Sequence, residues 1–369
     1  MRKALKKDSK SLVRQQQAQQ FIQYLLNGIP SWAAGSREIN DILLSTRIRL
    51  ARNLMKIPFP STATDGELKQ VMKEVEKACQ QAPLFSEASY LYLQDLDEIH
   101  RKVLVERRLI SPAFAEADHP GMVIIDAGES ISIMVNEEDH LRIQSIQPGL
   151  GLREAWRVIS RVDDELSEKL NYAFSEQFGY LTACPTNTGT GMRASILVHL
   201  PALSIMDEVE KVIHDLAPSE IAVRGFYGEG TEVIGNIFQV SNQLTLGRTE
   251  SAIVDRLEIV AHKFIELEQA ARERLFHERQ TELEDKVFRA LAILQNARIM
   301  SSLEFMNHLS MIRLGADLEL IRGLDSAIIS ELMIFTQPAH MQMLHKELHD
   351  AGSRDVIRAQ IIRKKMSLK

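Results

Sequence analysis

The chain of 369 residues lacks most features that mark secreted, membrane-spanning or nucleic-acid-binding proteins. Its two cysteines, Cys79 and Cys184, are too few and too far apart for a disulfide framework or a cysteine metal cluster. No apolar run reaches the roughly 18 residues that a membrane span needs, and the lysine-containing start lacks the apolar stretch of a secretory signal. A net charge of −6 provides no basic field to attract nucleic acid. We therefore expect a soluble cytoplasmic protein with no nucleic-acid or membrane partner.

The composition is that of an ordinary globular protein, 45% hydrophobic and 25% charged, and the length favours two or three domains. Residues 1–40 are polar and rich in glutamine, and we interpret them as an extension that is helical or partly disordered. Residues 41–255 carry short segments with period-2 alternation, separated by turns and a few helices. Residues 256–369 have helical spacing throughout. This order predicts an α+β domain followed by an all-helical C-terminal domain.

The clearest elements are strands with one apolar and one polar face. Residues 43–50 alternate in this way, and residues 122–126 and 131–135 predict a hairpin. The apolar spacing of residues 152–170 predicts a helix. Further strands are expected around 181 and at 193–200, 221–226 and 237–245.

The run from Val135 to Gln144 places three acids and a histidine ahead of an arginine. Ionised groups are costly in a sheet unless they are paired or used. If the run is one strand, Glu138 and Arg142 share a face while Leu141 points the other way, which suggests a polar cleft floor. An edge strand with a solvated charged face would have the same pattern.

Five arginines occupy strand positions where a sheet normally carries threonine or valine. Each of them alone fits a surface salt bridge, but five that converge on one cleft would require a dense anion, and a nucleotide triphosphate is suitable. They are Arg47, Arg49, Arg142, Arg193 and Arg224.

Two glycine-containing loops accompany the arginines. Residues 184–195 form a Thr/Gly-rich loop that can present backbone N–H groups to an anion, although it lacks the Gly-Lys-Ser/Thr of a Walker A loop. Residues 224–232 frame Glu229 with glycines that permit close approach of a ligand. A tight connection and a flexible hairpin explain these loops equally well.

The motifs STRIRLARN, NEEDHLRIQ, CPTNTGTGMRAS and RGFYGEG, in this order, resemble the ATP:guanidino phosphotransferase (phosphagen kinase) superfamily. The longer runs CPTNTGTGMRASILVHLPAL and RGFYGEGTEVIGNIFQVSNQLTLG, together with VDDEL, resemble its bacterial protein arginine kinase (McsB) branch. The resemblance covers roughly residues 41–255 and implies a largely antiparallel sheet flanked by helices. It also implies transfer of the γ-phosphoryl group of ATP to arginine side chains of proteins.

The resemblance implies roles for individual residues. The five arginines would clamp the ATP phosphates, and Mg²⁺ would be held mainly by those phosphates and by water. Glu138 and Glu229 would be the catalytic carboxylates that grip the substrate guanidinium, and the predicted alternation favours Glu138 over Glu137. Cys184 would lie near the guanidino group. Further candidates for nucleotide contacts are Ser45, Arg108 and Ser195.

Two positions depart from the superfamily patterns. Arg108 stands where the branch carries a histidine near the nucleotide, and an arginine there can stack on adenine or reach a phosphate. Leu197 stands where the small-molecule kinases carry a histidine, as expected for the protein-kinase branch.

The C-terminal segment RDVIRA, residues 354–359, resembles a phosphoarginine-binding motif of the same branch. Asp355 would pair with the guanidinium, and Arg354 or Arg358 with the phosphoryl group, although a solvated helix face has the same spacing. The branch implies a homodimer, an activator protein and a Clp-type protease as partners. Two alternatives stay open: a kinase for a small guanidino metabolite, and a phosphoarginine-binding adaptor without catalysis.

Overall fold

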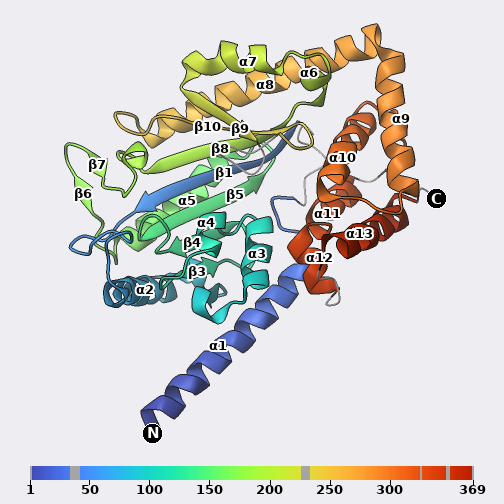
Figure 1. The fold of residues 1–369 in the computed structure, drawn as a ribbon. Helices are drawn as coiled ribbons and strands as arrows, with labels where there is room; N and C mark the ends of the chain where they lie inside the picture. The colour runs from blue at the N-terminus through green and yellow to red at the C-terminus, as the bar shows by residue number, and fades with distance from the viewer. Residues whose placement is uncertain (1, 34–41, 226–232, 325, 346–349, 368–369) are drawn as a thin grey trace.

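The computed structural model describes residues 2–33, 42–225, 233–324, 326–345 and 350–367. Its centre is an eight-stranded sheet in the order β2-β3-β4-β5-β1-β8-β10-β9, and all neighbouring strands are antiparallel (Figure 1). The strands are β1 (Leu43–Arg52), β2 (Ser89–Tyr92), β3 (Met122–Ile125), β4 (Ile131–Val135), β5 (Leu141–Pro148), β8 (Met192–His199), β9 (Ile221–Gly225) and β10 (Ile237–Asn242). A separate ribbon pairs β6 (Phe174–Ser175) with β7 (Gly179–Tyr180).

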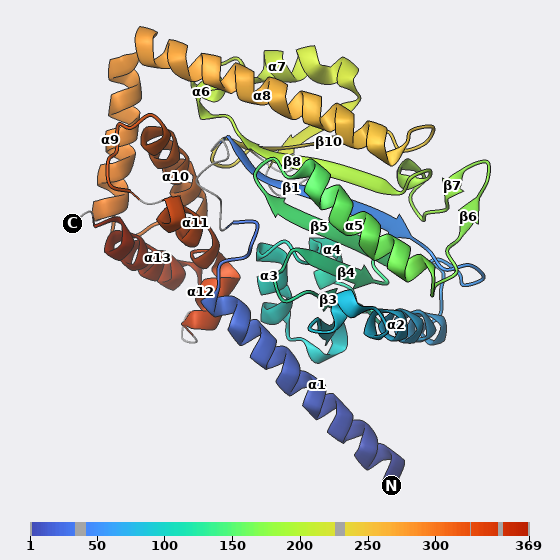
Figure 2. The same cartoon turned by 180° about the vertical axis from the view of Figure 1, so that it is seen from behind.

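Helices cover the sheet and form a separate layer at one end of it. Two of them, α5 and α8, lie across one face (Figure 2). The helices are α1 (Arg2–Asn27), α2 (Asp65–Gln80), α3 (Glu98–Glu106), α4 (Pro112–Ala115), α5 (Leu152–Ser167), α6 (Pro201–Ile205), α7 (Val209–Leu216), α8 (Glu250–Glu278), α9 (Gln280–Asn296), α10 (Ser302–Asp317), α11 (Ser326–Phe335), α12 (Pro338–Leu344) and α13 (Ala351–Met366). The search for a helix that could span a membrane, which covered the described residues, found none.

The central strands have one apolar and one polar face, as their alternation predicts. In β1, Ile48 and Leu50 are fully buried against the helices, whereas Arg47 and Arg49 lie on the opposite face. The same division separates Arg193 from Ala194 in β8. The predicted mixed fold with a largely antiparallel sheet is confirmed, and one face of this sheet is free of α5 and α8.

The Gln-rich N-terminal segment forms a helix that docks on the sheet domain through its second half. In α1, the buried residues Ala18, Ile22, Leu25 and Leu26 join a second apolar core with residues of α3, α4 and β3. The first half of α1 also contacts this domain, through Ser11 with Asp95 and Arg14 with the ring of Tyr92, and its N-terminal end projects beyond these contacts (Figure 1). Burial of about four apolar side chains is a substantial hydrophobic contribution, and it fixes this part of the predicted extension in place.

The helical C-terminal region begins inside a helix rather than at a linker. The predicted division between residues 255 and 256 falls within α8, which packs on β8 and continues to α9. Near its end, buried Glu268 accepts hydrogen bonds from the backbone N–H groups of Ala202 and Leu203 at the start of α6. Arg272 joins Glu268 to Asp317 of α10, so α8 ties the sheet domain to the helical one.

The acidic run is a turn and not a strand. Strand β4 ends at Val135 and β5 begins at Leu141, so the prediction of one continuous strand from 135 to 144 is wrong. Asn136 adopts a positive φ of 63°, a conformation that asparagine tolerates, and its amide donates to the carbonyls of Leu68 and Pro120. The prediction that Glu138 and Arg142 share a face assumed a continuous strand, and the turn removes that basis. Arg142 pairs instead with Glu137, at 2.6 Å.

Candidate active site

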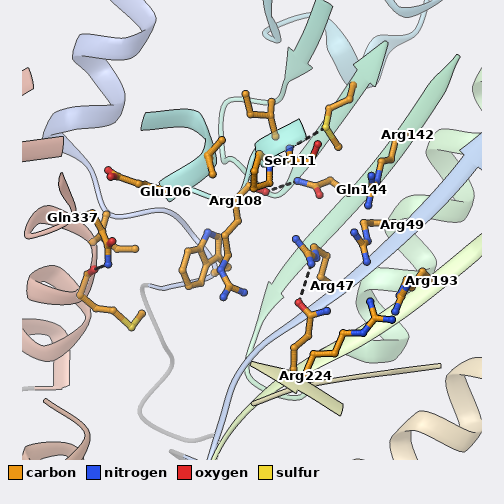
Figure 3. Close-up of a pocket in the computed structure, with 18 residues that line it drawn as sticks. Arg47, Arg49, Glu106, Arg108, Ser111, Arg142, Gln144, Arg193, Arg224 and Gln337 are labelled. Atoms are coloured by element: carbon orange, nitrogen blue, oxygen red, sulfur yellow. Dashed lines mark hydrogen bonds between the residues drawn. The ribbon is translucent and has the colours of Figure 1, made fainter. Parts of the chain in front are cut away.

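Two adjoining cavities open on the sheet face that α5 and α8 leave uncovered. The first has a volume of about 290 Å³ and the second about 500 Å³. Four arginines line both cavities, and Arg47 lines the first (Figure 3). The four shared residues are Arg49, Arg142, Arg193 and Arg224. The structure therefore brings the five arginines together as a boundary between two pockets of different chemistry.

Strand pairing explains this convergence. Arg49 of β1 lies directly opposite Arg193 of β8, and Arg142 projects from β5 on the other side of β1. Arg224 comes from β9, the last strand of the sheet, where it lies opposite Gln239 of β10. Because the strands are antiparallel neighbours with a fixed register, guanidinium groups distant in sequence meet on one face.

The arginine cluster contains guanidinium groups that repel one another and buried hydrogen-bond donors that lack acceptors. Burial, followed by repulsion from Arg108, Arg142 and Arg193, lowers the pKa of Arg47 to about 9. Burial, followed by repulsion from Arg47, Arg142 and Arg193, holds the pKa of Arg49 well below its usual value, although the carboxylate of Glu137 opposes this shift. Within the described part of the chain, Nε of Arg47 and Nε of Arg49 are buried without a hydrogen-bond partner. Buried donors and mutually repelling cations indicate a site for a polyanion such as a triphosphate.

The first cavity has a flat apolar wall beyond the arginines. Trp32 lies there together with Ile110 and Met134, and the guanidinium of Arg108 lies 5.1 Å from the centroid of the Trp32 indole. Arg108, which replaces the expected histidine, thus lines the cavity and presents a planar cation, as Figure 3 shows. Residue 32 lies in the segment predicted to be an extension; its only sequence signal is that the chain has two tryptophans.

The helical domain closes the first cavity from the other side. Met333 and Ile334 of α11 and Gln337, the N-cap of α12, are lining residues (Figure 3). Sequence reasoning gave no reason to place residues 333–337 next to residue 32, because such a contact depends on tertiary packing alone. Ser45 and Ser195, the further nucleotide candidates, are buried in their strands and are not among the lining residues of either cavity.

The α12 helix is held against the sheet domain by Glu106, the last residue of α3. Its carboxylate accepts hydrogen bonds from the backbone N–H groups of Ala339, at 2.6 Å, and His340, at 2.9 Å. It also contacts Nδ1 of His340 at 2.8 Å. The neighbouring Arg107 is fully buried, paired with Glu129 and directed at the carbonyl of Gly28 at the end of α1. These contacts join three parts of the chain next to the first cavity.

The second cavity is acidic and contains the turn. Glu137, Glu138 and Asp139 line it together with Cys184. Burial favours a higher pKa for Glu137, but Arg142 and the Ser111 hydroxyl outweigh it and lower this pKa. The pKa of Glu138 is raised, first by burial and then by the charges of Asp139 and Glu137. Burial raises the pKa of Asp139 as well, but Asp139 is buried whereas Glu138 is exposed. Of the acids with a raised pKa, Glu138 is therefore the one that a substrate in the cavity can reach.

The Thr/Gly-rich loop forms another wall of the second cavity. Thr245 donates hydrogen bonds to the carbonyls of Thr186 and Thr188 and so fixes the loop that carries Cys184. Gly191 has a φ of 63°, and a Cβ there would lie 2.6 Å from the carbonyl oxygen of Ala51. Only glycine permits this close approach of the loop to β1. Glu229, the second predicted catalytic carboxylate, lies outside the described residues.

The RDVIRA segment forms the second turn of α13, away from both cavities. Arg358 is buried, donates to the carbonyls of Thr336 and Met300 at 2.9 and 2.8 Å, and pairs with Asp355. Arg354 and Asp355 are half-buried. The guanidinium of Arg358 is used in fixing α13 to its neighbours, and Arg354 is the more exposed of the two arginines.

Comparisons with known proteins agree with this geometry. The model of the ATP:guanido phosphotransferase C-terminal catalytic domain matches residues 70–271, and that of the protein-arginine kinase McsB C-terminal domain matches residues 280–369. The protein-arginine kinase of Moorella thermoacetica is 46% identical over 335 residues, covering 90% of this chain and 96% of that protein. The protein-arginine kinase of Bacillus subtilis is 42% identical over 347 residues, covering 94% and 95%.

Solved structures support the same fold. The crystal structure of lombricine kinase matches with a TM-score of 0.57 and 23% identity, covering 66% of this chain and 70% of that one. At this identity the match concerns the fold alone, whereas the sequence matches span nearly the whole chain. The chain therefore belongs to the ATP:guanido phosphotransferase family, and within it to the protein-arginine kinase branch.

Proposed function

We propose that this protein is an ATP-dependent protein arginine kinase. The observation that carries the proposal is the row of arginines between the apolar wall of the first cavity and the acidic turn that lines the second. Such a boundary suits a triphosphate whose base lies on one side and whose γ-phosphoryl group meets a cationic acceptor on the other. The names of the most similar relatives support arginine as the acceptor.

In the first cavity, the base of ATP would lie against the apolar wall at Trp32, with Arg108 as a further planar contact. The phosphates would extend along the arginines and satisfy the buried Nε donors of Arg47 and Arg49. Mg²⁺ would be held mainly by the phosphates and by water, and would neutralise part of their charge. The arginines then stabilise the charge that spreads over the transferred group.

In the second cavity, the substrate guanidinium would meet Glu138 and, by family resemblance, Glu229. A guanidinium is a poor nucleophile because its pKa lies above about 12. As its nitrogen forms the bond to the γ-phosphorus, a carboxylate accepts the proton and the bond from phosphorus to the bridging oxygen breaks, which releases ADP. Glu138 suits the base role because its surroundings raise its pKa. Two carboxylates would also hold the planar group in line.

The decisive experiment is transfer from γ-labelled ATP to a protein substrate in the presence of Mg²⁺, with detection of an acid-labile phosphoarginine. Glu138→Ala and Glu229→Ala are expected to lower kcat by about 10²–10⁴-fold. A wild-type protein that labels no arginine would refute the proposal. In that case binding of phosphoarginine without transfer would identify the adaptor alternative.

A kinase for a small guanidino metabolite is the second alternative. Free arginine offered beside a protein substrate separates the two functions, since phosphorylation of free arginine alone would identify a metabolite kinase. The extensive match of the C-terminal region to that of protein-arginine kinases favours the protein substrate.

The resemblance also suggests a cellular context. We propose that the phosphorylated proteins are marked for a Clp-type protease in the cytoplasm, that an activator protein assists, and that the helical domain forms a homodimer. Phosphoarginine would bind as an allosteric ligand at Arg354 and Asp355, with Arg358 as the internal support of that site. Addition of free phosphoarginine to the kinase assay, with Arg354→Ala as the variant, tests the allosteric part.

A further inference from the structure

A buried pair of side chains ties the walls of the acidic cavity together. Asn53, the residue after β1, donates from Nδ2 to Oδ1 of Asp139 at 2.6 Å and to the carbonyl of Leu181 at 3.0 Å. Its Oδ1 accepts from the backbone N–H of His140 at 2.8 Å. Asp139 Oδ1 also accepts from the backbone N–H of Ala183 at 2.7 Å. Both side chains are at most 2% exposed.

These bonds connect three segments that are far apart in sequence. Asn53 belongs to the end of β1, Asp139 to the acidic turn, and Ala183 to the loop that carries Cys184. The turn and the loop lie outside the strands β5 and β8, which begin at Leu141 and Met192. Backbone bonds close each segment separately, from the Glu137 N–H to the carbonyl of Asp139 in the turn and between Tyr180 and Gly189 at the base of the loop. The side-chain bonds of Asn53 and Asp139 add the link between the two segments.

The turn is fixed on both sides of Glu138. On one side, Arg142 and Ser111 hold Glu137 at 2.6 and 2.7 Å. On the other, Asn53 and Ala183 hold Asp139. Glu138 lies between the two fixed acids, is itself exposed and lines the cavity next to Cys184. Because the residues on both sides of Glu138 are fixed, the direction of its side chain is restricted.

We propose that Asn53 and Asp139 are positioning residues that hold Glu138 and the Cys184 loop in the arrangement needed for phosphoryl transfer. The inference rests on the proposed function, and it assigns to an uncharged residue outside the arginine cluster a role in the rate of the chemical step. A displacement of about 1 Å in a catalytic group can cost about 10²-fold in rate. The role therefore predicts a loss in kcat rather than in ATP binding.

Three variants separate geometry from charge. Asn53→Asp keeps the size of the side chain but places a second carboxylate against Asp139, which abolishes the hydrogen bond between residues 53 and 139. Asp139→Asn removes only the charge. The hydrogen bonds from Asn53 and from the Ala183 N–H can be kept, because both are accepted by the single atom Oδ1. The double variant Asn53→Asp/Asp139→Asn reverses donor and acceptor between the two positions.

For Asn53→Asp we expect kcat to fall at least about tenfold, with the KM for ATP changed less than about twofold. We compare kcat at a pH above the acid limb of both profiles, because the added carboxylate also raises the pKa of Glu138. The other charged groups around the pair, Glu137 and Arg142, are the same in both proteins. The double variant should recover part of the lost kcat.

For Asp139→Asn we expect a smaller loss of kcat at high pH than for Asn53→Asp, because the hydrogen bonds to Oδ1 can be kept. The acid limb of its pH profile should move to lower pH, because the charge of Asp139 helps to raise the pKa of Glu138. A loss of kcat equal to that of Asn53→Asp would show that the rate depends on the charge of Asp139 and not on its hydrogen bond with Asn53, and would overturn the proposal. Unchanged kcat in Asn53→Asp would overturn it as well.

Thermal unfolding and ATP affinity establish that each variant is folded. Asn236→Asp is the control: it removes the hydrogen bond of a half-buried asparagine to Ser310 at 2.9 Å, in contact with α10 rather than with either cavity. It should lower the Tm without lowering kcat. If Asn53→Asp is too unstable to assay, a folded double variant without activity overturns the proposal. Absence of arginine phosphorylation by the wild type refutes the proposed function instead, so the two failures are distinguishable.

Discussion

The carboxylate of Glu106 offers a direct test of how the helical domain contributes to the nucleotide cavity. Glu106→Ala removes the acceptor of two backbone N–H groups at the start of α12 and of His340 Nδ1. Loss of a helix cap costs about 0.5–2 kcal/mol, and a hydrogen bond to a charged group contributes about 1.5–3 kcal/mol. Since these contributions overlap, we expect local destabilisation of α12 by about 2–4 kcal/mol.

Amide hydrogen exchange measures this effect where it arises. A loss of about 2–4 kcal/mol corresponds to exchange that is roughly 30- to 1,000-fold faster across residues 338–344, provided that exchange proceeds through local opening. The KM for ATP should rise in parallel, because Met333, Ile334 and Gln337 line the cavity next to the loosened helix. Saturating ATP should restore part of the protection, since a ligand stabilises the state that binds it.

Glu98→Ala is the matched control, because Glu98 lies at the other end of the same helix and its side chain is 81% exposed. In the described part of the chain it forms a salt bridge with Lys102, which is exposed as well. Such a pair contributes about 0.3–0.5 kcal/mol at most, so exchange in α12 and the KM for ATP should stay at wild-type values. Unchanged exchange across 338–344 in Glu106→Ala, or faster exchange with an unchanged KM, would refute the link between the α12 contact and the nucleotide cavity.

Four further outcomes follow from the geometry. Trp32→Ala should raise the KM for ATP by about 5- to 100-fold with little change in kcat, because stacking of a base on an aromatic ring contributes about 1–3 kcal/mol. Steady-state kinetics with varied ATP concentration measures this effect, and an unchanged KM would show that Trp32 does not contact the base. Glu137→Gln should keep measurable kcat yet weaken ATP binding, since Arg142 loses the charged partner that orients it at 2.6 Å; a loss as severe as in Glu138→Ala would contradict the assignment. Arg358→Ala should lower the free energy of unfolding by about 2–4 kcal/mol, because it leaves the carbonyls of Thr336 and Met300 without their donor; equal denaturant midpoints would contradict this. The free energy of unfolding should also fall as the pH drops below about 6.5. Burial lowers the pKa of His199 well below its ordinary value, so the unfolded chain binds a proton more readily than the folded one. His199→Gln should make the Tm depend less on pH between about pH 7.5 and 5.5 in thermal unfolding.

The sheet and the arginine cluster could be predicted because both depend on local alternation. A strand such as β1 fixes the face of Arg47 and Arg49 by period 2 alone, and the family resemblance implied that the five arginines meet at one site. The acidic turn could not be predicted in the same way. Its course depends on the left-handed backbone of Asn136, which is stabilised by the carbonyls of Leu68 and Pro120, and neither contact has a local signal.

The apolar wall of the first cavity lay beyond sequence reasoning for a similar cause. Trp32 and Gln337 reach the cavity through packing of α1 and α12 on the sheet domain, and neither lies in a motif or in an alternating segment. The role of Asn53 was also hidden, because a single asparagine after a strand normally indicates a turn. Its function becomes apparent only when the acidic turn and the Cys184 loop are placed on either side of it.

The position of the nucleotide cavity has a consequence for synthesis of the chain. Its walls come from residue 32 near the start, from the central sheet, and from residues 333–337 near the end. A ribosome therefore completes every strand of the sheet before the last wall emerges, and a nascent chain holds the arginine cluster without the full enclosure for ATP. Chains cut short before residue 333 keep the arginines but lack that wall, so the enclosure of the nucleotide cavity is complete only once the last helices have docked.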